Sequence, residues 1–287
     1  MSEWAVITCA VTGVLTDPAR HPVPVTVEEM ARACGEARDA GASVVHLHFR
    51  QQDAGRGHLP TWEPETCARI TRAIRDECPG ILVNMSTGVV GPDVSGPVGA
   101  LPAVRPEIAA LNAGSLNYLK TRRDGRWAWP PILFDNPVDK VERMLTAIRS
   151  VGAVPEFECF DTGIVRSVGL FVHHGMVTAP HVNFVMGVAS GQPADPELLP
   201  ILLRQLPPDA TWEVTAIGRR EVWELHRRAA ELGGALRTGL EDTFYLPDGT
   251  AASGNGPLVE ALVKLAEDAG RKIAGPEQAR RLLGVSS

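Results

Sequence analysis

Short apolar stretches alternate along the chain with longer segments in which apolar residues recur every three or four positions. The short stretches predict β-strands and the longer segments predict amphipathic helices. The predicted strands cover residues 5–11, 43–49, 81–85, 107–111, 153–159, 181–186, 211–215 and 235–239. The predicted helices cover residues 26–40, 62–77, 137–151, 162–175, 195–205, 219–232 and 257–271.

Eight strands separated by helices, with no internal repeat and no break in composition, predict an α/β fold of the (β/α)8 or TIM-barrel class. We expect residues 1–287 to form a single barrel domain, and residues 276–284 to add a short C-terminal helix outside it. A doubly wound open sheet is the main alternative. It is disfavoured because no GxGxxG pattern follows the first predicted strand.

Composition narrows the classes of function. The net charge is −6 and there is no long basic run, so we expect no nucleic-acid partner, although a local basic patch could still bind an anionic ligand. No apolar stretch reaches the roughly 18 residues that a membrane span requires, and the N-terminus does not resemble a secretion signal. Five scattered cysteines without a CxxC pattern are typical of free thiols, so we predict a cytoplasmic protein.

In a TIM barrel, chemistry takes place at the C-terminal ends of the strands and in the loops that follow them. The chain has unusual loops after its first three predicted strands. The segment from Asn112 to Asn136 is longer still and lacks strong periodicity. A segment of that length usually covers a site as a lid or forms an oligomer contact.

The stretch "VVHLHFR" places His46 and His48 two positions apart in a predicted strand. Residues i and i+2 of a strand share one face, so the two imidazoles would stand side by side and could share a metal ion. A carboxylate is a common third ligand, and the adjacent Glu241 and Asp242 follow the eighth predicted strand. Taken alone, each pattern also has an explanation without a metal. The two histidines could simply be buried, and the two carboxylates could belong to an ordinary acidic loop.

Several motifs occur together in one order along nearly the whole chain. They are "HLHFR" (46–50), "STG" (86–88), "LNAGSLN" (111–117), "PEFECFDTG" (155–163), "FVMGV" (184–188), "RTGLEDTFY" (237–245) and "GPEQARRLLG" (275–284). With these motifs the chain resembles the β-keto acid cleavage enzymes, whose founding activity is 3-keto-5-aminohexanoate cleavage. The resemblance implies a zinc-dependent TIM barrel, usually a homotetramer, that condenses a β-keto acid with acetyl-CoA to give acetoacetate and a new acyl-CoA.

The resemblance also assigns residues. It implies His46, His48 and Glu241 as zinc ligands. It implies Arg237 and Asp242 as a reactive dyad, in which the carboxylate is the base and the arginine orients it. The remaining implied residues are Glu158 as a further catalytic group, and Ser86, Thr87 and Asn112 as substrate contacts. Without the resemblance, the dyad would also fit a structural ion pair, and the last three would fit ordinary turn residues.

Arg219 and Arg220 open the helix after the seventh predicted strand. Phosphate groups often bind near strands seven and eight of such barrels, so one of these arginines is a candidate contact for the CoA phosphates. The alternative is a charged helix on the barrel exterior.

Two departures from the founding enzyme bear on the substrate. Its "ITGAE" segment carries an acid that meets the substrate's amino group, whereas Val14 and Leu15 stand in the segment here, and Ala110 replaces a threonine. An ammonium group without a counter-charge is disfavoured in a buried pocket. We therefore predict an uncharged β-keto acid that contacts Leu15. Arg20 could instead attract a second carboxylate, which leaves a dicarboxylic substrate open.

Two other functions remain open at this point. One is a metal-dependent hydrolase or aldolase on the same barrel that does not use CoA. The other is a binding or regulatory protein that has lost catalysis. The presence of both Arg237 and Asp242 argues against the second, because binding alone does not require a dyad.

Overall fold

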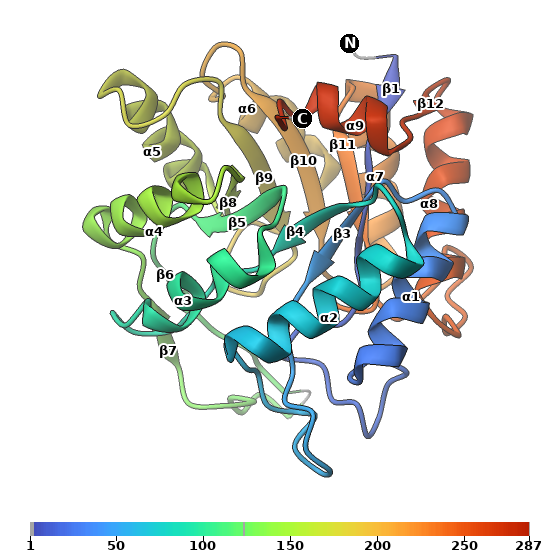
Figure 1. The fold of residues 1–287 in the computed structure, drawn as a ribbon. Helices are drawn as coiled ribbons and strands as arrows, with labels where there is room; N and C mark the ends of the chain where they lie inside the picture. The colour runs from blue at the N-terminus through green and yellow to red at the C-terminus, as the bar shows by residue number, and fades with distance from the viewer. Residues whose placement is uncertain (1–2, 123, 287) are drawn as a thin grey trace.

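A closed barrel of eight parallel strands forms the centre of the protein (Figure 1). The computed structural model describes residues 3–122 and 124–286. The barrel strands are β2 (Ile7–Ala10), β3 (Val44–Leu47), β4 (Leu82–Met85), β5 (Ile108–Asn112), β8 (Val154–Cys159), β9 (His181–Met186), β10 (Thr211–Ala216) and β11 (Ala235–Thr238). Strand β11 pairs with β2 and closes the barrel, which confirms the predicted (β/α)8 fold and all eight predicted strands.

Helices surround the barrel where the periodic segments predicted them. These are α1 (Val27–Asp39), α2 (Pro64–Glu77), α4 (Val138–Ser150), α5 (Thr162–His173), α7 (Glu221–Leu232) and α8 (Asn255–Asp268). The predicted helix over residues 195–205 is a 3-10 turn, η1 (Pro196–Leu198), followed by the short α6 (Leu199–Leu203). None of the helices in the described part of the chain is long and apolar enough to cross a membrane.

Helix α3 (Ser95–Val104) was not predicted. Its sequence, SGPVGALPAV, contains two glycines and two prolines and has no polar face, so it lacks the usual helical pattern. The close contact between α3 and Trp62 explains why Gly96 is a glycine. A Cβ atom at Gly96 would lie 2.7 Å from the Trp62 ring, so the missing side chain lets α3 approach the segment before α2 closely.

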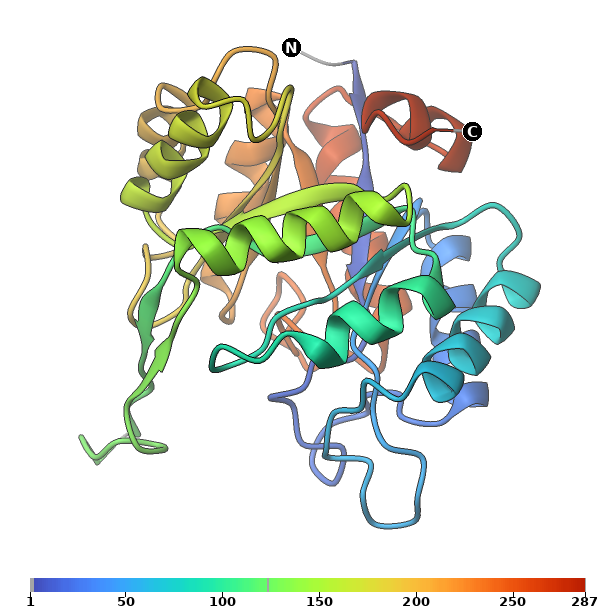
Figure 2. The ribbon, with the colours of Figure 1, turned by 60° about the vertical axis from the view of Figure 1, so that its left-hand side comes forward.

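The long segment between β5 and α4 also contains unpredicted structure. Strands β6 (Leu116–Tyr118) and β7 (Ile132–Phe134) pair antiparallel, and the hairpin that they form projects away from the barrel (Figure 2). Two short strands at the opposite end, β1 (Trp4–Ala5) and β12 (Lys272–Ile273), pair in parallel.

The N-terminal end of the barrel is closed by the C-terminal helix α9 (Pro276–Leu282), which matches the predicted short terminal helix. Residues at the N-terminal ends of the strands, among them Val44, Leu82 and Ile108, form one apolar cluster with Leu283 and Val285. Water is therefore excluded from this end, and the opposite end is the one that is left for chemistry.

The middle of the barrel interior is polar. Glu156 of β8 accepts hydrogen bonds from Asn84 Nδ2 (2.9 Å) and Asn183 Nδ2 (3.2 Å), and its Oε2 lies 3.5 Å from His181 Nε2. Glu213 of β10 accepts from Thr8 Oγ1 at 2.6 Å and from Asn183 Nδ2 at 3.3 Å. Every carboxylate oxygen of this layer thus has a partner, as burial of polar groups requires.

Burial and mutual contact shift the titration of this layer. Burial alone would raise the pKa of Glu156, but the hydrogen bond and charge of His181 hold that pKa at about 2. Burial lowers the pKa of His181, yet Glu156 outweighs it and the net shift is upward. Burial, together with the charge of Glu156, raises the pKa of Glu213 to about 7.

We expect Glu213→Gln to flatten the pH dependence of stability. The pKa of Glu213 is about 7 in the folded protein against an ordinary 4.5, so folding retains a proton in this range. The stability that this proton contributes is complete below pH 4.5 and is lost as the pH rises through about 7. The free energy of unfolding of the variant, measured by urea denaturation across this range, should therefore fall less steeply than that of the wild type. The matched control is Glu224→Gln on the exposed face of α7, whose curve should run parallel to the wild type. Parallel curves for both variants would contradict the assignment.

Candidate active site

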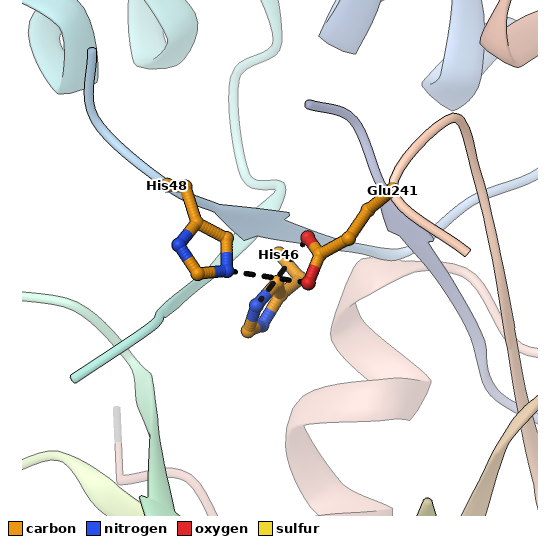
Figure 3. Close-up of side chains that lie close together, drawn as sticks. All are labelled: His46, His48 and Glu241. Atoms are coloured by element: carbon orange, nitrogen blue, oxygen red, sulfur yellow. Dashed lines mark hydrogen bonds and ion pairs between the residues drawn. The ribbon is translucent and has the colours of Figure 1, made fainter. Parts of the chain in front are cut away.

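His46, His48 and Glu241 meet at the C-terminal end of the barrel (Figure 3). His46 lies within β3, His48 follows the strand, and Glu241 follows β11. Nε2 of His48 is 3.2 Å from Glu241 Oε1, and Nε2 of His46 is 3.8 Å from Glu241 Oε2. The two imidazole rings are 5.2 Å apart between centroids. One ligand atom from each residue lies within 4.8 Å of the other two, which is a separation that one metal ion can bridge.

Close packing of the first and last barrel strands positions Glu241. The Glu241 amide donates to Ala10 O at 3.2 Å. A Cβ atom at Gly239 would lie 2.1 Å from Ala10 O, and one at Gly13 would lie 2.7 Å from Glu241 Cγ. Gly13 also has a φ of +59°, which glycine adopts at little cost. Both glycines therefore let the β2 and β11 ends approach closely enough to direct Glu241 at the histidines.

The protonation states of His46 and Glu241 suit a metal ion. Burial, reinforced by the charge of Arg237, lowers the pKa of His46 to about 3, so its imidazole is neutral. Burial alone would raise the pKa of Glu241, but His48 and Arg237 hold it well below its ordinary value. Glu241 Oε2 is buried and has no hydrogen-bond partner among the described residues. Neutral imidazoles and a carboxylate are the forms that bind Zn²⁺, so the three residues fit such an ion.

Arg237 is the charged centre of the site and is 2% exposed. Its Nε and Nη2 donate to the two carboxylate oxygens of Asp242, both at 3.0 Å, and Nη2 also donates to Glu241 Oε1 at 2.9 Å. Its Nη1 lies 3.8 Å from Glu158 Oε1 and has no hydrogen-bond partner among the described residues. One guanidinium therefore orients three carboxyl groups and keeps one donor available.

The two other carboxyl groups around Arg237 titrate near neutral pH. Burial raises the pKa of Asp242 to about 7, although Arg237 opposes the shift. Burial likewise raises the pKa of Glu158 to about 8 against the same arginine. Strongly shifted carboxyl groups that are gathered in one place are typical of catalytic sites.

The three predicted substrate contacts lie at the ends of β4 and β5. Ser86, Thr87 and Asn112 are all buried. The Thr87 hydroxyl donates to Ala110 O, so it serves the backbone in this arrangement. Asn112 Oδ1 is buried and has no partner among the described residues, so it can still accept a hydrogen bond.

Arg50 is a buried residue that the sequence interpretation missed. It is 1% exposed, and its guanidinium donates to Thr12 Oγ1 (2.9 Å), Gly57 O (2.9 Å) and Thr16 O (2.8 Å). It therefore ties the loop after β2 to the loop after β3. The only feature of the sequence that could have indicated a role for Arg50 is its position at the end of the "HLHFR" motif. The residues that follow it look like an ordinary polar loop, in which an arginine is usually exposed.

The structure does not bring four of the named residues into this cluster. Leu15 is 69% exposed on the loop after β2. The side chain of Arg20 is 80% exposed and lies 3.4 Å from Asp17. Arg219 and Arg220 are exposed at the start of α7.

The surroundings of Arg219 are acidic and aromatic. Its guanidinium lies 4.5 Å from the centroid of the Tyr245 ring. A cavity of about 390 Å³ lies beside the start of α7, and its lining includes Asp195 and Glu221.

Solved structures support the fold. The apo structure of ObcA superimposes with a TM-score of 0.73 at 19% sequence identity, over 92% of this chain. The matched region spans 66% of that protein's own length. At this level of identity the likeness concerns the barrel alone.

Sequence relatives share the full length. A 3-oxoadipate:acetyl-CoA acetyltransferase from Cupriavidus necator is 36% identical, over 100% of this chain and 97% of its own length. A 3-keto-5-aminohexanoate cleavage enzyme from Fusobacterium nucleatum is 33% identical, over 99% of both chains. The sequence pattern of the beta-keto acid cleavage enzymes matches residues 5–285. The match extends over nearly the whole chain, and the chain therefore belongs to the beta-keto acid cleavage enzyme family.

Proposed function

We propose that this enzyme condenses a β-keto acid with acetyl-CoA and releases acetoacetate and a new acyl-CoA. The observation that carries the proposal is the bidentate pairing of Arg237 with Asp242 directly beside His46, His48 and Glu241. The names of both relatives, which pair a β-keto acid with cleavage or with acetyl-CoA, support it.

The proposed metal is Zn²⁺, held by His46, His48 and Glu241. When bound, it would supply a Lewis acid that polarises the substrate ketone. Asp242 is the proposed base, and it takes a proton from the methyl group of acetyl-CoA. Arg237 orients that carboxylate, and its free Nη1 is available for a substrate carboxylate.

The other proposed contacts lie at the ends of β4 and β5. Ser86, Thr87 and Asn112 would hold substrate oxygens, with the amide of Asn112 offering a donor as well as its free Oδ1. Glu158 is the second candidate for proton transfer, because it faces Arg237 Nη1 at 3.8 Å.

The competing reaction is a metal-dependent hydrolysis or aldol cleavage without CoA. It uses the same three candidate ligands, but it does not need a thioester partner. Acetoacetate release from a β-keto acid that requires acetyl-CoA would favour condensation. Equal turnover with and without acetyl-CoA would favour the competing reaction.

We expect His46→Ala and His48→Ala each to abolish metal binding and turnover together, because two remaining ligands hold Zn²⁺ weakly. The wild type should contain about one Zn²⁺ per chain. Elemental analysis by mass spectrometry measures the content. The control is His174→Ala, an exposed histidine at the end of α5, which should keep both the metal and the activity. Full activity of metal-free protein would refute the metal site.

Asp242→Asn should keep the metal and lose the base. The amide preserves the shape of the side chain and leaves the three candidate ligands unchanged. Turnover should fall by a factor on the order of 10²–10⁴, the usual effect of losing a general base. Turnover and zinc content, measured on the same preparation of the variant, test this prediction. Near-normal turnover would assign the proton transfer to Glu158 instead.

The predicted substrate is uncharged, because Val14 and Leu15 stand where the founding enzyme has an acid. Leu15 is 69% exposed, so a substrate tail would have to cover it. We expect turnover to decrease from neutral alkyl β-keto acids to amino-substituted ones, since each methylene buried against Leu15 contributes about 0.8 kcal/mol and an ammonium meets no carboxylate at that position. Leu15→Glu should raise activity on the amino-substituted acid and weaken it on neutral ones. A wild-type preference for the amino-substituted acid would contradict this prediction.

A dicarboxylic β-keto acid is the second candidate substrate. The 36% identity to the 3-oxoadipate enzyme favours it, and Arg20 is the basic residue on the same loop. A substrate panel that includes a dicarboxylic acid separates the two candidates. Arg20→Ala should reduce turnover of the dicarboxylic acid only, if that acid is the substrate.

We also propose that the protein forms a homotetramer in the cytoplasm. Closed symmetry is the usual arrangement of such enzymes, and the Asn112–Asn136 segment is the proposed subunit contact or lid. Light scattering measures the mass in solution, where four copies of the 30.8 kDa chain are expected and a monomer would be contrary to the prediction.

A further inference from the structure

The hairpin of residues 116–134, here called the basic arm, has a charge opposite to that of the whole chain. It contains four lysines or arginines and one aspartate, whereas the protein carries a net charge of −6. In the described part of the arm, Lys120, Arg122 and Arg126 are all exposed. These three cations outnumber the one carboxylate of the arm, Asp124, so the projecting segment is a local basic patch that attracts anions.

The base of the basic arm lies at the rim of the active site. A Cβ atom at Gly88, in the loop after β4, would lie 3.1 Å from Nδ2 of the proposed substrate contact Asn112 and 3.5 Å from Cζ of Phe134 in the arm. The Leu119 amide donates to Ser190 Oγ, in the loop after β9, at 3.2 Å. Phe134 packs edge-on against Phe160, just after β8, with ring centroids 6.3 Å apart. The barrel thus holds the base firmly beside the cluster.

A row of aromatic and basic side chains leads outward from this base. Trp129 stacks on Tyr118 with centroids 6.2 Å apart and planes 14° from parallel, and Lys120 Nζ lies 5.3 Å from the Trp129 ring. Farther out, Arg122 Nη2 donates to Ala128 O at 3.1 Å. From Tyr118 to Arg122 the extended chain covers about 13 Å. The arm therefore runs from the reacting groups to exposed cations, with aromatic faces between them.

The shape and charge of acetyl-CoA match this gradient. Its reactive thioester lies at one end of a flexible pantetheine chain, and adenine with three phosphate groups lies at the other. Arginines bind phosphates through paired donors, and exposed aromatic rings stack on nucleobases. Trp127 is 51% exposed on the arm and offers such a ring.

We propose that the basic arm binds the nucleotide end of acetyl-CoA, with the phosphates at Lys120, Arg122 and Arg126 and the adenine on Trp127. The inference rests on the proposed function, since it assumes that the thioester reaches the Arg237–Asp242 dyad.

The start of α7, where Arg219 and Arg220 were predicted to meet the phosphates, is less suitable. Arg219 already lies over Tyr245, and its amide donates to Glu221 Oε1 at 3.1 Å. The charged residues in the lining of the neighbouring cavity are both acidic, Asp195 and Glu221. Phosphates placed there would meet like charges. The arm has one acidic residue, Asp124, and that carboxylate pairs with Arg126 at 2.6 Å.

The test compares acetyl-CoA with acetyl-N-acetylcysteamine, a thioester that lacks the nucleotide. Selectivity is the kcat/KM for acetyl-CoA divided by the kcat/KM for acetyl-N-acetylcysteamine, both measured with the zinc-loaded protein. The double variant Arg122→Ala/Arg126→Ala should lower this ratio about 10- to 100-fold, because charged hydrogen bonds to phosphate are lost. The dissociation constant of 3′,5′-ADP, measured by calorimetry, should rise by a similar factor. Trp127→Ala should raise the same constant. The matched control is Arg69→Ala/Arg72→Ala on the exposed face of α2, which removes the same charge and should leave both values unchanged.

The outcomes separate the hypotheses. Unchanged selectivity in the arm variant, with a loss in Arg219→Ala/Arg220→Ala, would overturn the inference and place the phosphates at α7. Unchanged selectivity with an altered mass in solution would overturn it in favour of a subunit contact through exposed Ile132 and Leu133. Equal turnover of both thioesters by the wild type would refute the inference while the proposed function stands. Weaker 3′,5′-ADP binding by the arm variant, in a protein that makes no acetoacetate, would uphold the inference and refute the proposed function.

Discussion

A single buried guanidinium organises the candidate active site. Arg237 is 2% exposed, and a charge in that position is stable only where opposite charges and hydrogen-bond acceptors surround it. Asp242 and Glu241 supply them from the turn after β11, and Glu158 lies opposite on β8. The same pairing that stabilises the arginine turns Glu241 toward the histidines and keeps Asp242 in one orientation. The requirement to neutralise one charge therefore sets the geometry of the whole site.

The layers of the barrel show how this charged site is supported. The N-terminal layer is apolar and is sealed by α9, but the middle layer consists of Glu156, His181, Glu213 and their amide and hydroxyl partners. Such barrels usually fill this space with branched aliphatic side chains. Here a polar layer, in which every carboxylate oxygen has a partner, lies between the apolar end and the active site. The charge of Arg237 acts to lower the pKa of both Glu156 and Glu213, so the titration of this layer and the electrostatics of the site depend on each other.

The two sides of the barrel mouth are held by different means. On the β2 and β3 side, Arg50 binds carbonyl and hydroxyl groups of both loops, and Gly13 allows one of them to pack against Glu241. On the β5 side, the basic arm is anchored at its base by the Ser190 hydrogen bond and by aromatic contacts, while its tip is exposed. A rigid side suits groups that must be positioned within fractions of an ångström, and an exposed side suits a long, charged substrate.

The sequence by itself determined the alternation of strands and helices, because hydrophobic periodicity is a local property that survives in any barrel of this kind. It also determined that His46 and His48 share one face, because the strand period of two is local as well. Helix α3 and the β6–β7 hairpin escaped prediction, since one has no polar face and the other is an exposed arm without a strong pattern. Only the tertiary structure decided that Glu241 lies 3.2 Å from His48, a residue 193 positions earlier. It likewise decided that Arg50 is buried and that Arg237 has three carboxyl neighbours. The contacts of Glu241 and Arg237 depend on closure of β11 onto β2, and the closure of a barrel is a property of all eight strands together that no local stretch of sequence carries.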